Sequence, residues 1–194
     1  MSVPLSREQL RDRLHEAFIW RGREMLADTS GWWAAPHVLS HLGPALADLH
    51  REAAPTLVTG VESRGFLIGS LVAIALGVGF VEIRKEMSTQ DVGESVLSVA
   101  TMPDYNGRRL RLSVRRRLLP PGSRVLLVDD WVDTGATAHG VRQLVAACRG
   151  TWVGVAAMVD GLGDADRRRL RLRSLLSDRE LGWDRWEMAG AAAC

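Results

Sequence analysis

Apolar residues along this chain recur in two patterns, one typical of helices and the other of buried strands. Helical spacing of Leu, Val and Phe is found in three segments, at 5–20, 36–49 and 64–76. Short apolar runs typical of strands covered on both faces lie at 56–61, 80–83, 125–128 and 152–158. A further helix is expected from 134 onward, because apolar residues follow there at helical spacing. This alternation predicts an α/β fold with a doubly wound, mostly parallel sheet flanked by helices.

Both patterns stop between 84 and 108, where Ser, Thr, Gln, Gly, Asn and Pro dominate. An irregular stretch of this length is typical of a functional lid or a disordered segment. After it, Leu110, Leu112 and Val114 alternate with arginines, which predicts a half-exposed strand. The expected organisation is an N-terminal hood at 1–50, a core domain at 51–180 that includes a mobile loop at 86–107, and a C-terminal tail at 181–194.

Composition narrows the class of protein and of partner. The chain has 194 residues and a formal net charge of +2, which is too small to indicate a nucleic-acid partner. No apolar run approaches the length of a membrane span and no secretory signal pattern is found, so we expect a cytoplasmic protein without a membrane partner. Cys148 and Cys194 have no metal-ligand spacing and are expected to be free thiols.

Candidate chemistry is concentrated where the predicted strand at 125–128 ends. Asp129 and Asp130 follow the strand directly, and ligands in open α/β sheets bind outside the carboxyl ends of strands. The segment 134–137 (Thr-Gly-Ala-Thr) then opens a helix, and its free N–H groups, hydroxyls and glycine suit a phosphate. Acids beside a phosphate site would repel the anion unless they contacted sugar hydroxyls or a divalent cation. The pattern therefore predicts a sugar phosphate ligand.

A second strand end carries a complementary set of groups. Glycines at 60 and 65 flank Glu62, Ser63 and Arg64 at the junction between the strand at 56–61 and the next helix. Exposed N–H groups together with a guanidinium suit pyrophosphate, because this polyanion needs several donors at once.

These motifs resemble those of the type I phosphoribosyltransferase family, and among its members those of adenine phosphoribosyltransferases. The run 125–137 is similar to the family's strand, Asp-Asp and Thr-Gly signature. The run 62–66 (Glu-Ser-Arg-Gly-Phe) resembles an Asp-Ser-Arg-Gly-Phe motif, and 83–85 (Ile-Arg-Lys) matches a motif that precedes a mobile catalytic loop. The likeness spans roughly residues 27–176, in the same order and with similar spacing.

The resemblance implies roles for particular residues. Asp129 and Asp130 would bind the ribose 2′ and 3′ hydroxyls of 5-phosphoribosyl 1-pyrophosphate, and the loop from Asp133 would hold its 5′-phosphate. The other residues of this phosphate loop are Thr134, Gly135, Ala136 and Thr137. The pyrophosphate would contact Glu62, Ser63, Arg64, Arg84 and Lys85, with Arg84 reaching across a dimer interface. Mg²⁺ would bind mostly through the substrate and through Asp129.

Two acids remain candidates for proton transfer to or from the base. Asp104 corresponds to the acid of the family's Leu-Glu-Tyr-Gly loop end, where Tyr105 would cover the pyrophosphate. Asp104 is one methylene shorter than the family's Glu. Asp133 stands where adenine enzymes usually carry Ala, but hypoxanthine-guanine relatives have an Asp there near the purine. The resemblance leaves both assignments open.

Other departures also fall on the nucleobase side. Leu26 replaces a stacking Phe, and Trp20, Trp32 or Trp33 could supply another aromatic face, although buried Trp is more often core. In the relatives the residue at Leu162 lies against the base. The base is therefore less firmly predicted than the sugar donor.

The expected function is Mg²⁺-dependent transfer of a phosphoribosyl group to a purine, most simply adenine, by a homodimer. One alternative is a related transferase that uses another nucleobase or another sugar-phosphate pyrophosphate. Another is a non-catalytic regulator that senses the donor. Such regulators carry a winged-helix domain, and only about fifty residues precede the first expected core strand here, too few for that domain and a hood.

Overall fold

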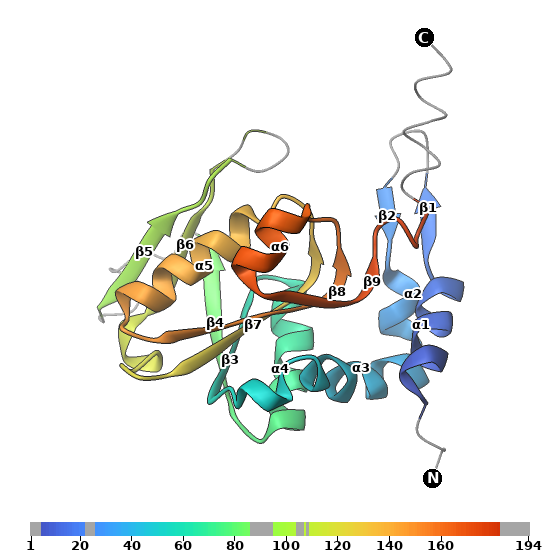
Figure 1. Cartoon of the computed structure of the whole chain (residues 1–194), viewed down its shortest axis with the longest axis horizontal. Coiled ribbons are helices and arrows are strands. Elements are labelled where there is room, and N and C mark those ends of the chain that lie inside the picture. The colour runs from blue at the N-terminus through green and yellow to red at the C-terminus, as the bar shows by residue number, and fades with distance from the viewer. Residues whose placement is uncertain (1–4, 22–25, 86–94, 104–106, 108, 183–194) are drawn as a thin grey trace.

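The computed structural model describes residues 5–21, 26–85, 95–103, 107 and 109–182. Its centre is a seven-stranded sheet with the order β5-β6-β4-β3-β7-β8-β9 (Figure 1). The strands are β3 (Leu57–Val61), β4 (Gly79–Lys85), β5 (Val96–Ala100), β6 (Arg111–Arg115), β7 (Arg124–Val132), β8 (Thr151–Asp160) and β9 (Leu172–Ser177). Strands β4, β3, β7, β8 and β9 pair in parallel, whereas β6 and β5 extend the sheet antiparallel. The doubly wound, mostly parallel sheet is confirmed.

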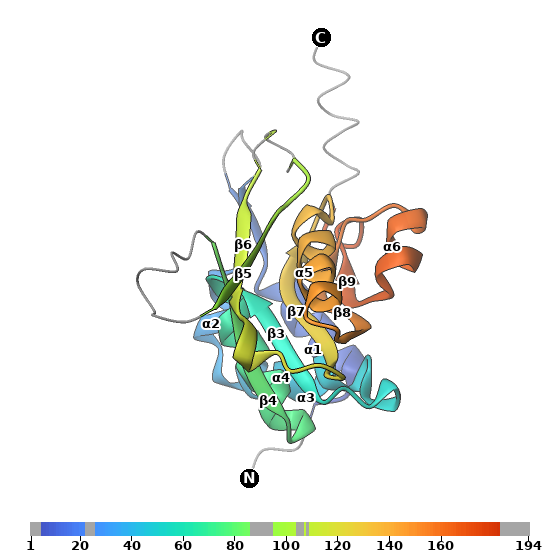
Figure 2. The same ribbon diagram turned by 90° about the vertical axis from the view of Figure 1, so that its left-hand side faces the viewer.

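Helices cover both faces of this sheet. On one face lie α3 (Pro36–Asp48) and α4 (Arg64–Leu76), and on the other lie α5 (Ala136–Ala147) and α6 (Asp164–Leu170) (Figures 1 and 2). Strand β7 supplies both cores, because successive side chains of a strand point to opposite faces. Leu126 and Val128 belong to the core beneath α3 and α4, and Leu127 belongs to the core beneath α5. Residues 125–128 of the strand are all apolar because both of its faces are buried there.

The order of the strands creates a crevice at one edge of the sheet. From β3 the chain passes through α4 to β4 on one side, and from β7 it passes through α5 to β8 on the other. Strands β3 and β7 are direct neighbours, with Gly60 opposite Val128. Their carboxyl ends therefore form a topological switch point, the usual ligand position in such sheets.

The N-terminal part differs from the expected single helix at 5–20. Helix α1 (Arg7–Glu16) begins at the Ser6 capping box and ends at Ala17, and residues Ile19–Arg21 form strand β1. Strand β1 pairs with β2 (Leu26–Asp28), and a short helix α2 (Ser30–Ala34) follows. Phe18 continues the helical spacing in the sequence, but its ring packs on Trp20 and Trp32, at centroid distances of 4.9 and 5.8 Å. Tertiary aromatic contacts therefore outweigh the local helical pattern.

Three further elements correct the sequence interpretation. Strand β5 lies within the stretch expected to be irregular, although four of its five residues are apolar. It pairs along β6, where Ser98 and Ser113 share a hydrogen bond of 2.8 Å. Strand β6, by contrast, follows the expected alternation, with Leu112 and Val114 buried and Arg111 exposed. Helix α6 and strand β9 follow β8 and were not predicted. None of the described helices is long and apolar enough to cross a membrane.

Candidate active site

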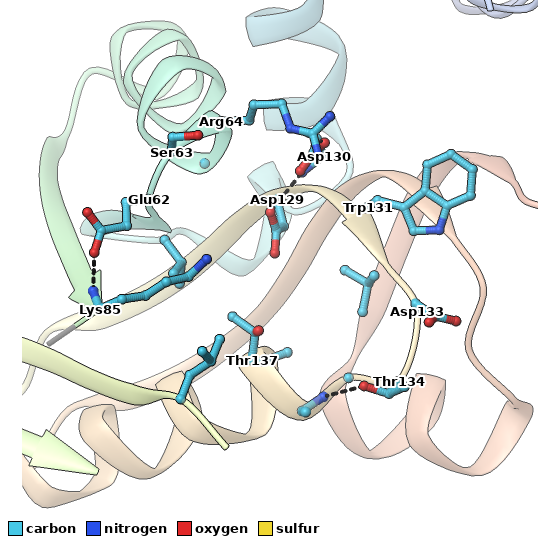
Figure 3. A pocket seen from close by; sticks show the side chains of 17 residues that line it. Glu62, Ser63, Arg64, Lys85, Asp129, Asp130, Trp131, Asp133, Thr134 and Thr137 are labelled. Carbon is cyan, nitrogen blue, oxygen red and sulfur yellow. Dashed lines mark hydrogen bonds and ion pairs between the residues drawn. The ribbon is translucent and has the colours of Figure 1, made fainter. Parts of the chain in front are cut away.

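A pocket of about 350 Å³ opens at the switch point between β3 and β7 (Figure 3). Four segments from different parts of the sequence form its walls: the β3–α4 junction, the end of β4, Leu110 just before β6, and the β7–α5 junction. Its lining residues are Val61, Glu62, Ser63, Arg64, Gly65, Lys85, Leu110, Asp129, Asp130, Trp131, Val132, Asp133, Thr134, Gly135, Ala136, Thr137 and Ala138. The two motifs singled out in the sequence thus face one space.

The two acids at the end of β7 occupy the centre of the pocket (Figure 3). Asp130 is buried, and its Oδ2 lies 2.9 Å from Nε of Arg64. Asp129 is half-buried and accepts a hydrogen bond of 3.0 Å from the backbone N–H of Asp130. Burial, and then the negative charge of Asp130, raise the pKa of Asp129 well above its ordinary value. The pair is therefore suited to a ligand that donates hydrogen bonds or brings positive charge.

The turn from β7 into α5 has the geometry of an anion site. Gly135 precedes the helix with a φ of 71°, a left-handed conformation that glycine adopts without strain. The Thr134 hydroxyl accepts a hydrogen bond of 3.3 Å from the Ala136 N–H. The N-cap residue Gly135 has no side chain that could cap α5, so the N–H groups that follow Ala136 are available to a phosphate.

The junction between β3 and α4 is shaped by close backbone approach. A Cβ added to Gly60 would overlap the carbonyl oxygen of Gly65, so a side chain does not fit there. The Glu62 carboxylate accepts a hydrogen bond from the Lys85 N–H, which ties this loop to the end of β4. Arg64 donates to the Thr29 hydroxyl at 3.1 Å and lies against Asp130, so it links the N-terminal part to the acid pair.

Two further residues form the end of the pocket opposite Glu62 and Lys85 (Figure 3). Asp133 is exposed, but partial desolvation by the surrounding chain raises the pKa of its carboxyl group. Trp131 is half-buried, and its ring lies 6.1 Å from that of Phe18 and 6.0 Å from that of Trp20. This end of the pocket thus combines an aromatic surface with an acid whose pKa is raised.

Comparison with known proteins identifies the family. The model of the phosphoribosyl transferase domain matches residues 34–187. This chain belongs to the phosphoribosyltransferase family. It is 34% identical over 145 residues to an adenine phosphoribosyltransferase of Synechococcus sp., covering 74% of this chain and 78% of that protein.

Solved structures of phosphoribosyltransferases agree with this assignment. Adenine phosphoribosyltransferase from Rhodothermus marinus superposes with a TM-score of 0.74 at 27% identity, over 88% of this chain and 99% of that one. The Saccharomyces cerevisiae enzyme, complexed with an imino-altritol bisphosphate and adenine, gives a TM-score of 0.73 at 25% identity, over 87% and 99% of the two chains.

Most residues of the phosphoribosyltransferase motifs converge on the pocket, but three described candidates do not line it. Arg84 forms an ion pair of 2.8 Å with Glu82 and lies 5.6 Å from the ring of Phe66. Leu26 is 64% exposed on β2, and Leu162 is buried close to Gly135. Asp104 and Tyr105 lie outside the described residues.

The aromatic candidates also need revision. Trp32 is fully buried and donates to the Leu14 carbonyl at 2.7 Å, so it belongs to the core. Trp20 donates to the Leu181 carbonyl at 2.7 Å, and Trp33 to the Thr29 hydroxyl at 3.3 Å. Trp131 is the tryptophan that lines the pocket, and sequence reasoning missed it. Its place between Asp130 and Asp133 was the available signal, since the strand end carries all three residues to the crevice.

The donor set at the pocket suits a cation held jointly with a ligand. In the described part of the chain, no three His, Cys, Asp or Glu side chains gather as a metal site. Asp129 and Asp130 are adjacent hard oxygen donors, which is what Mg²⁺ requires when substrate phosphates and water complete its shell.

Proposed function

We propose that this chain transfers the 5-phosphoribosyl group of 5-phosphoribosyl 1-pyrophosphate to a purine base, with adenine as the favoured acceptor. The observation that carries the proposal is the convergence of the acid pair and the uncapped start of α5 in one pocket. Their chemistry matches the two ends of a phosphorylated pentose: acids for hydroxyls and N–H groups for phosphate. Adenine is favoured because the curated relatives are adenine phosphoribosyltransferases and the yeast structure contains adenine.

In this proposal the donor lies across the pocket with its pyrophosphate toward the β3–α4 loop. The N–H groups of that loop, Arg64 and Lys85 bind the pyrophosphate, and the loop 134–137 binds the 5′-phosphate. Asp129 and Asp130 accept hydrogen bonds from the 2′ and 3′ hydroxyls. The bond between C1′ and the pyrophosphate oxygen breaks, and that oxygen keeps the electron pair.

The acceptor must approach C1′ from the side opposite the leaving group. The end of the pocket lined by Trp131 and Asp133 lies across from Glu62 and Lys85, so we assign the base to that end (Figure 3). A ring nitrogen of the base forms the new bond to C1′, and its proton passes to an acid. We assign this role to Asp133, which lines that end of the pocket, and keep Asp104 as the second candidate.

Mg²⁺ is expected to accompany the donor. When bound it would neutralise charge on the pyrophosphate and so improve the leaving group. Asp129 would hold it, mostly through the substrate. Donor binding would also offset the repulsion between the two acids, because hydroxyl donors and a cation stabilise their charged forms.

We also infer a homodimer formed through α4. Leu67 and Ile74 are seven residues apart on this helix and are 45% and 78% exposed, which is unusual for large apolar side chains. Arg84 lies outside its own pocket and over Phe66, which follows Arg64 on the same helix. A second copy seated on this face would bury Ile74 and bring Arg84 toward the partner's pocket.

A competition assay tests the proposed function. The protein would be incubated with the ribosyl donor, Mg²⁺ and an equimolar mixture of adenine, hypoxanthine, guanine and the pyrimidine bases, and the products weighed by mass spectrometry. We expect AMP and pyrophosphate in equal amounts. If a different nucleotide formed, the acceptor would be another base and not adenine. If the donor stayed intact in every mixture, the proposed transferase activity would be rejected.

A further inference from the structure

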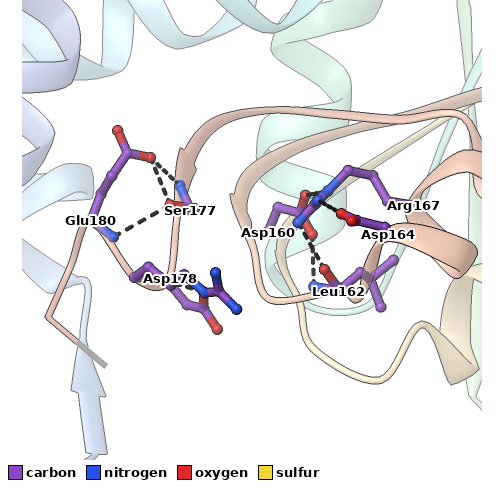
Figure 4. Close-up of polar contacts among 8 residues, drawn as sticks. Asp160, Leu162, Asp164, Arg167, Ser177, Asp178 and Glu180 are labelled. Carbon is purple, nitrogen blue, oxygen red and sulfur yellow. Dashed lines mark hydrogen bonds and ion pairs between the residues drawn. The ribbon is translucent and has the colours of Figure 1, made fainter. Parts of the chain in front are cut away.

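The turn between β8 and α6, residues 160–163, is held by a single arginine (Figure 4). Arg167 Nε lies 2.5 Å from Oδ2 of Asp160, and its Nη2 donates to the Leu162 carbonyl at 2.7 Å. The other oxygen of Asp160 accepts from the Leu162 N–H at 2.8 Å. The Asp160 side chain is only 4% exposed, so its charge depends on this guanidinium for compensation. Arg167 and Asp160 together fix both backbone polar groups of Leu162.

The helix that carries Arg167 is itself anchored. Nε2 of His139 on α5 lies 3.2 Å from Oδ1 of Asp166 on α6, and Arg142 on α5 donates to the Arg169 carbonyl at 3.0 Å. Arg167 also pairs with Asp164 at 2.8 Å within its own helix. The guanidinium therefore projects from a helix docked on α5, the same helix whose start forms the phosphate loop.

The β8–α6 turn in turn contacts the base end of the pocket. The Gly161 N–H donates to the Val132 carbonyl at 2.9 Å. A Cβ added to Gly161 would lie 3.6 Å from Cα of Asp133 and 2.9 Å from Oδ2 of Asp178, so the turn fits tightly between them. Leu162 packs from the other side, 3.3 Å from a Cβ built on Gly135. Movement of the turn would therefore displace the backbone that carries Asp133.

We propose that Arg167 is a positioning residue for nucleobase recognition, acting through Asp160 and the β8–α6 turn on Asp133. The inference rests on the proposed function, because it takes the Asp133 end of the pocket as the base end. Arg167 touches neither the donor site nor the pocket lining. Its loss should therefore weaken base binding while the donor half of the site, built from β3, β4 and the start of α5, keeps its geometry.

The kinetic test compares Arg167→Met with Arg169→Met. Both variants keep an apolar stem on α6, but Arg169 is 66% exposed and has only a 3.6 Å ion pair to Asp166. We expect Arg167→Met to raise the KM for the base about tenfold, with the KM for the donor and kcat changed less than about twofold. Arg169→Met should behave like the unmodified protein, and Arg167→Lys should recover part of the loss. Equal rises in both KM values would indicate a general structural role and overturn the proposal.

A double-mutant cycle and hydrogen exchange complete the test. If Arg167 acts on Asp133, the effects of Arg167→Met and Asp133→Ala on the KM for the base should overlap rather than multiply. Multiplying effects would contradict that route. The peptide covering 161–163 should exchange its amide hydrogens about tenfold faster in Arg167→Met, because the Leu162 N–H loses its fixed acceptor. Unchanged exchange would overturn the proposed role of Arg167, and this readout does not require transfer activity. Absence of transfer to any base by the unmodified protein would instead reject the proposed function.

Discussion

Asp129 and Asp130 are neighbouring acids placed where burial and mutual repulsion disfavour a double negative charge. Arg64 compensates Asp130 from 2.9 Å, but the pKa of Asp129 is raised by burial and by its neighbour. Without a ligand, two charged carboxylates at this position destabilise the folded protein. A ligand that brings hydroxyl donors and a cation stabilises the charged forms of both acids. The stability that the unbound protein loses through this acid pair therefore indicates, at the residue scale, that the two acids serve ligand binding.

Replacing one acid of this pair should stabilise the protein and impair transfer. The folded-state pKa of Asp129 lies above that of the unfolded chain, so between the two values the folded state binds more protons and stability falls as pH rises. Asp129→Asn removes this loss, and we expect Tm to rise by about 3 °C at pH 8. Transfer activity should fall about 10- to 100-fold. Thermal unfolding at pH 8 and near pH 4 measures the effect. The gain in Tm should shrink in acid, and a lower Tm at pH 8 would contradict this account.

At the scale of elements, the pocket depends on how closely α4 approaches β3. The Gly60 position admits no side chain because the Gly65 carbonyl lies against it. This contact draws the loop with Glu62 and Arg64 toward the end of β7. The elements therefore set the distance between the β3–α4 loop and the acid pair at the end of β7.

A methyl group at Gly60 should separate these elements. We expect Gly60→Ala to lower the free energy of unfolding by about 2 kcal/mol and to raise the KM for the donor. Gly79→Ala is the matched control on the neighbouring strand, where a Cβ would meet only Leu57 Cδ1, at 3.5 Å. Urea unfolding and donor kinetics of both variants provide the measurement. If the two substitutions had the same effect, the close approach would have no special importance.

The elements show which features a sequence can predict. Helix α4 was predicted with its observed bounds, because its apolar run begins after the Ser63 turn and ends at Gly77, which has a φ of 69°. Strand β5 and helix α6 were missed, since their stability comes from partners distant in sequence: β5 pairs with β6, and α6 is docked on α5 by ion pairs and hydrogen bonds. The local sequence pattern therefore predicts the strands and helices of the parallel core, but it does not predict the elements added at the edges of the sheet.

The same distinction holds for the site. Residues of contiguous motifs, such as 62–64, 129–130 and 133–137, were predicted to bind one ligand, and they line one pocket. Trp131 was missed although it lies between predicted site residues, and its ring contacts to Phe18 and Trp20 are visible only in the structure. Arg84 and Leu162 do not line the pocket, and their roles remain predictions. The resemblance supplied Leu26, which is exposed on β2.

At the scale of the whole molecule, the proposed homodimer rests on exposed apolar residues of α4. Ile74 is 78% exposed in a described structure whose other large apolar residues are mostly buried. We expect the chain to sediment at twice its mass, and Ile74→Lys to sediment as a monomer with reduced transfer. Ile19→Lys serves as the control, because Ile19 is 51% exposed on β1, away from α4. Analytical ultracentrifugation measures the mass of each variant in solution. An unmodified protein that is monomeric and fully active would contradict the proposed dimer.

The central claim is that the β7–α5 junction binds an activated pentose phosphate, and calorimetric titration with 5-phosphoribosyl 1-pyrophosphate and Mg²⁺ tests it most directly. The account predicts saturable binding that weakens about 100-fold in the double variant Asp129→Asn, Asp130→Asn. Asp48→Asn, at the exposed end of α3, should bind as the unmodified protein does. Equal affinity in the double variant, with its fold intact by circular dichroism, would contradict the assignment of these acids to the sugar.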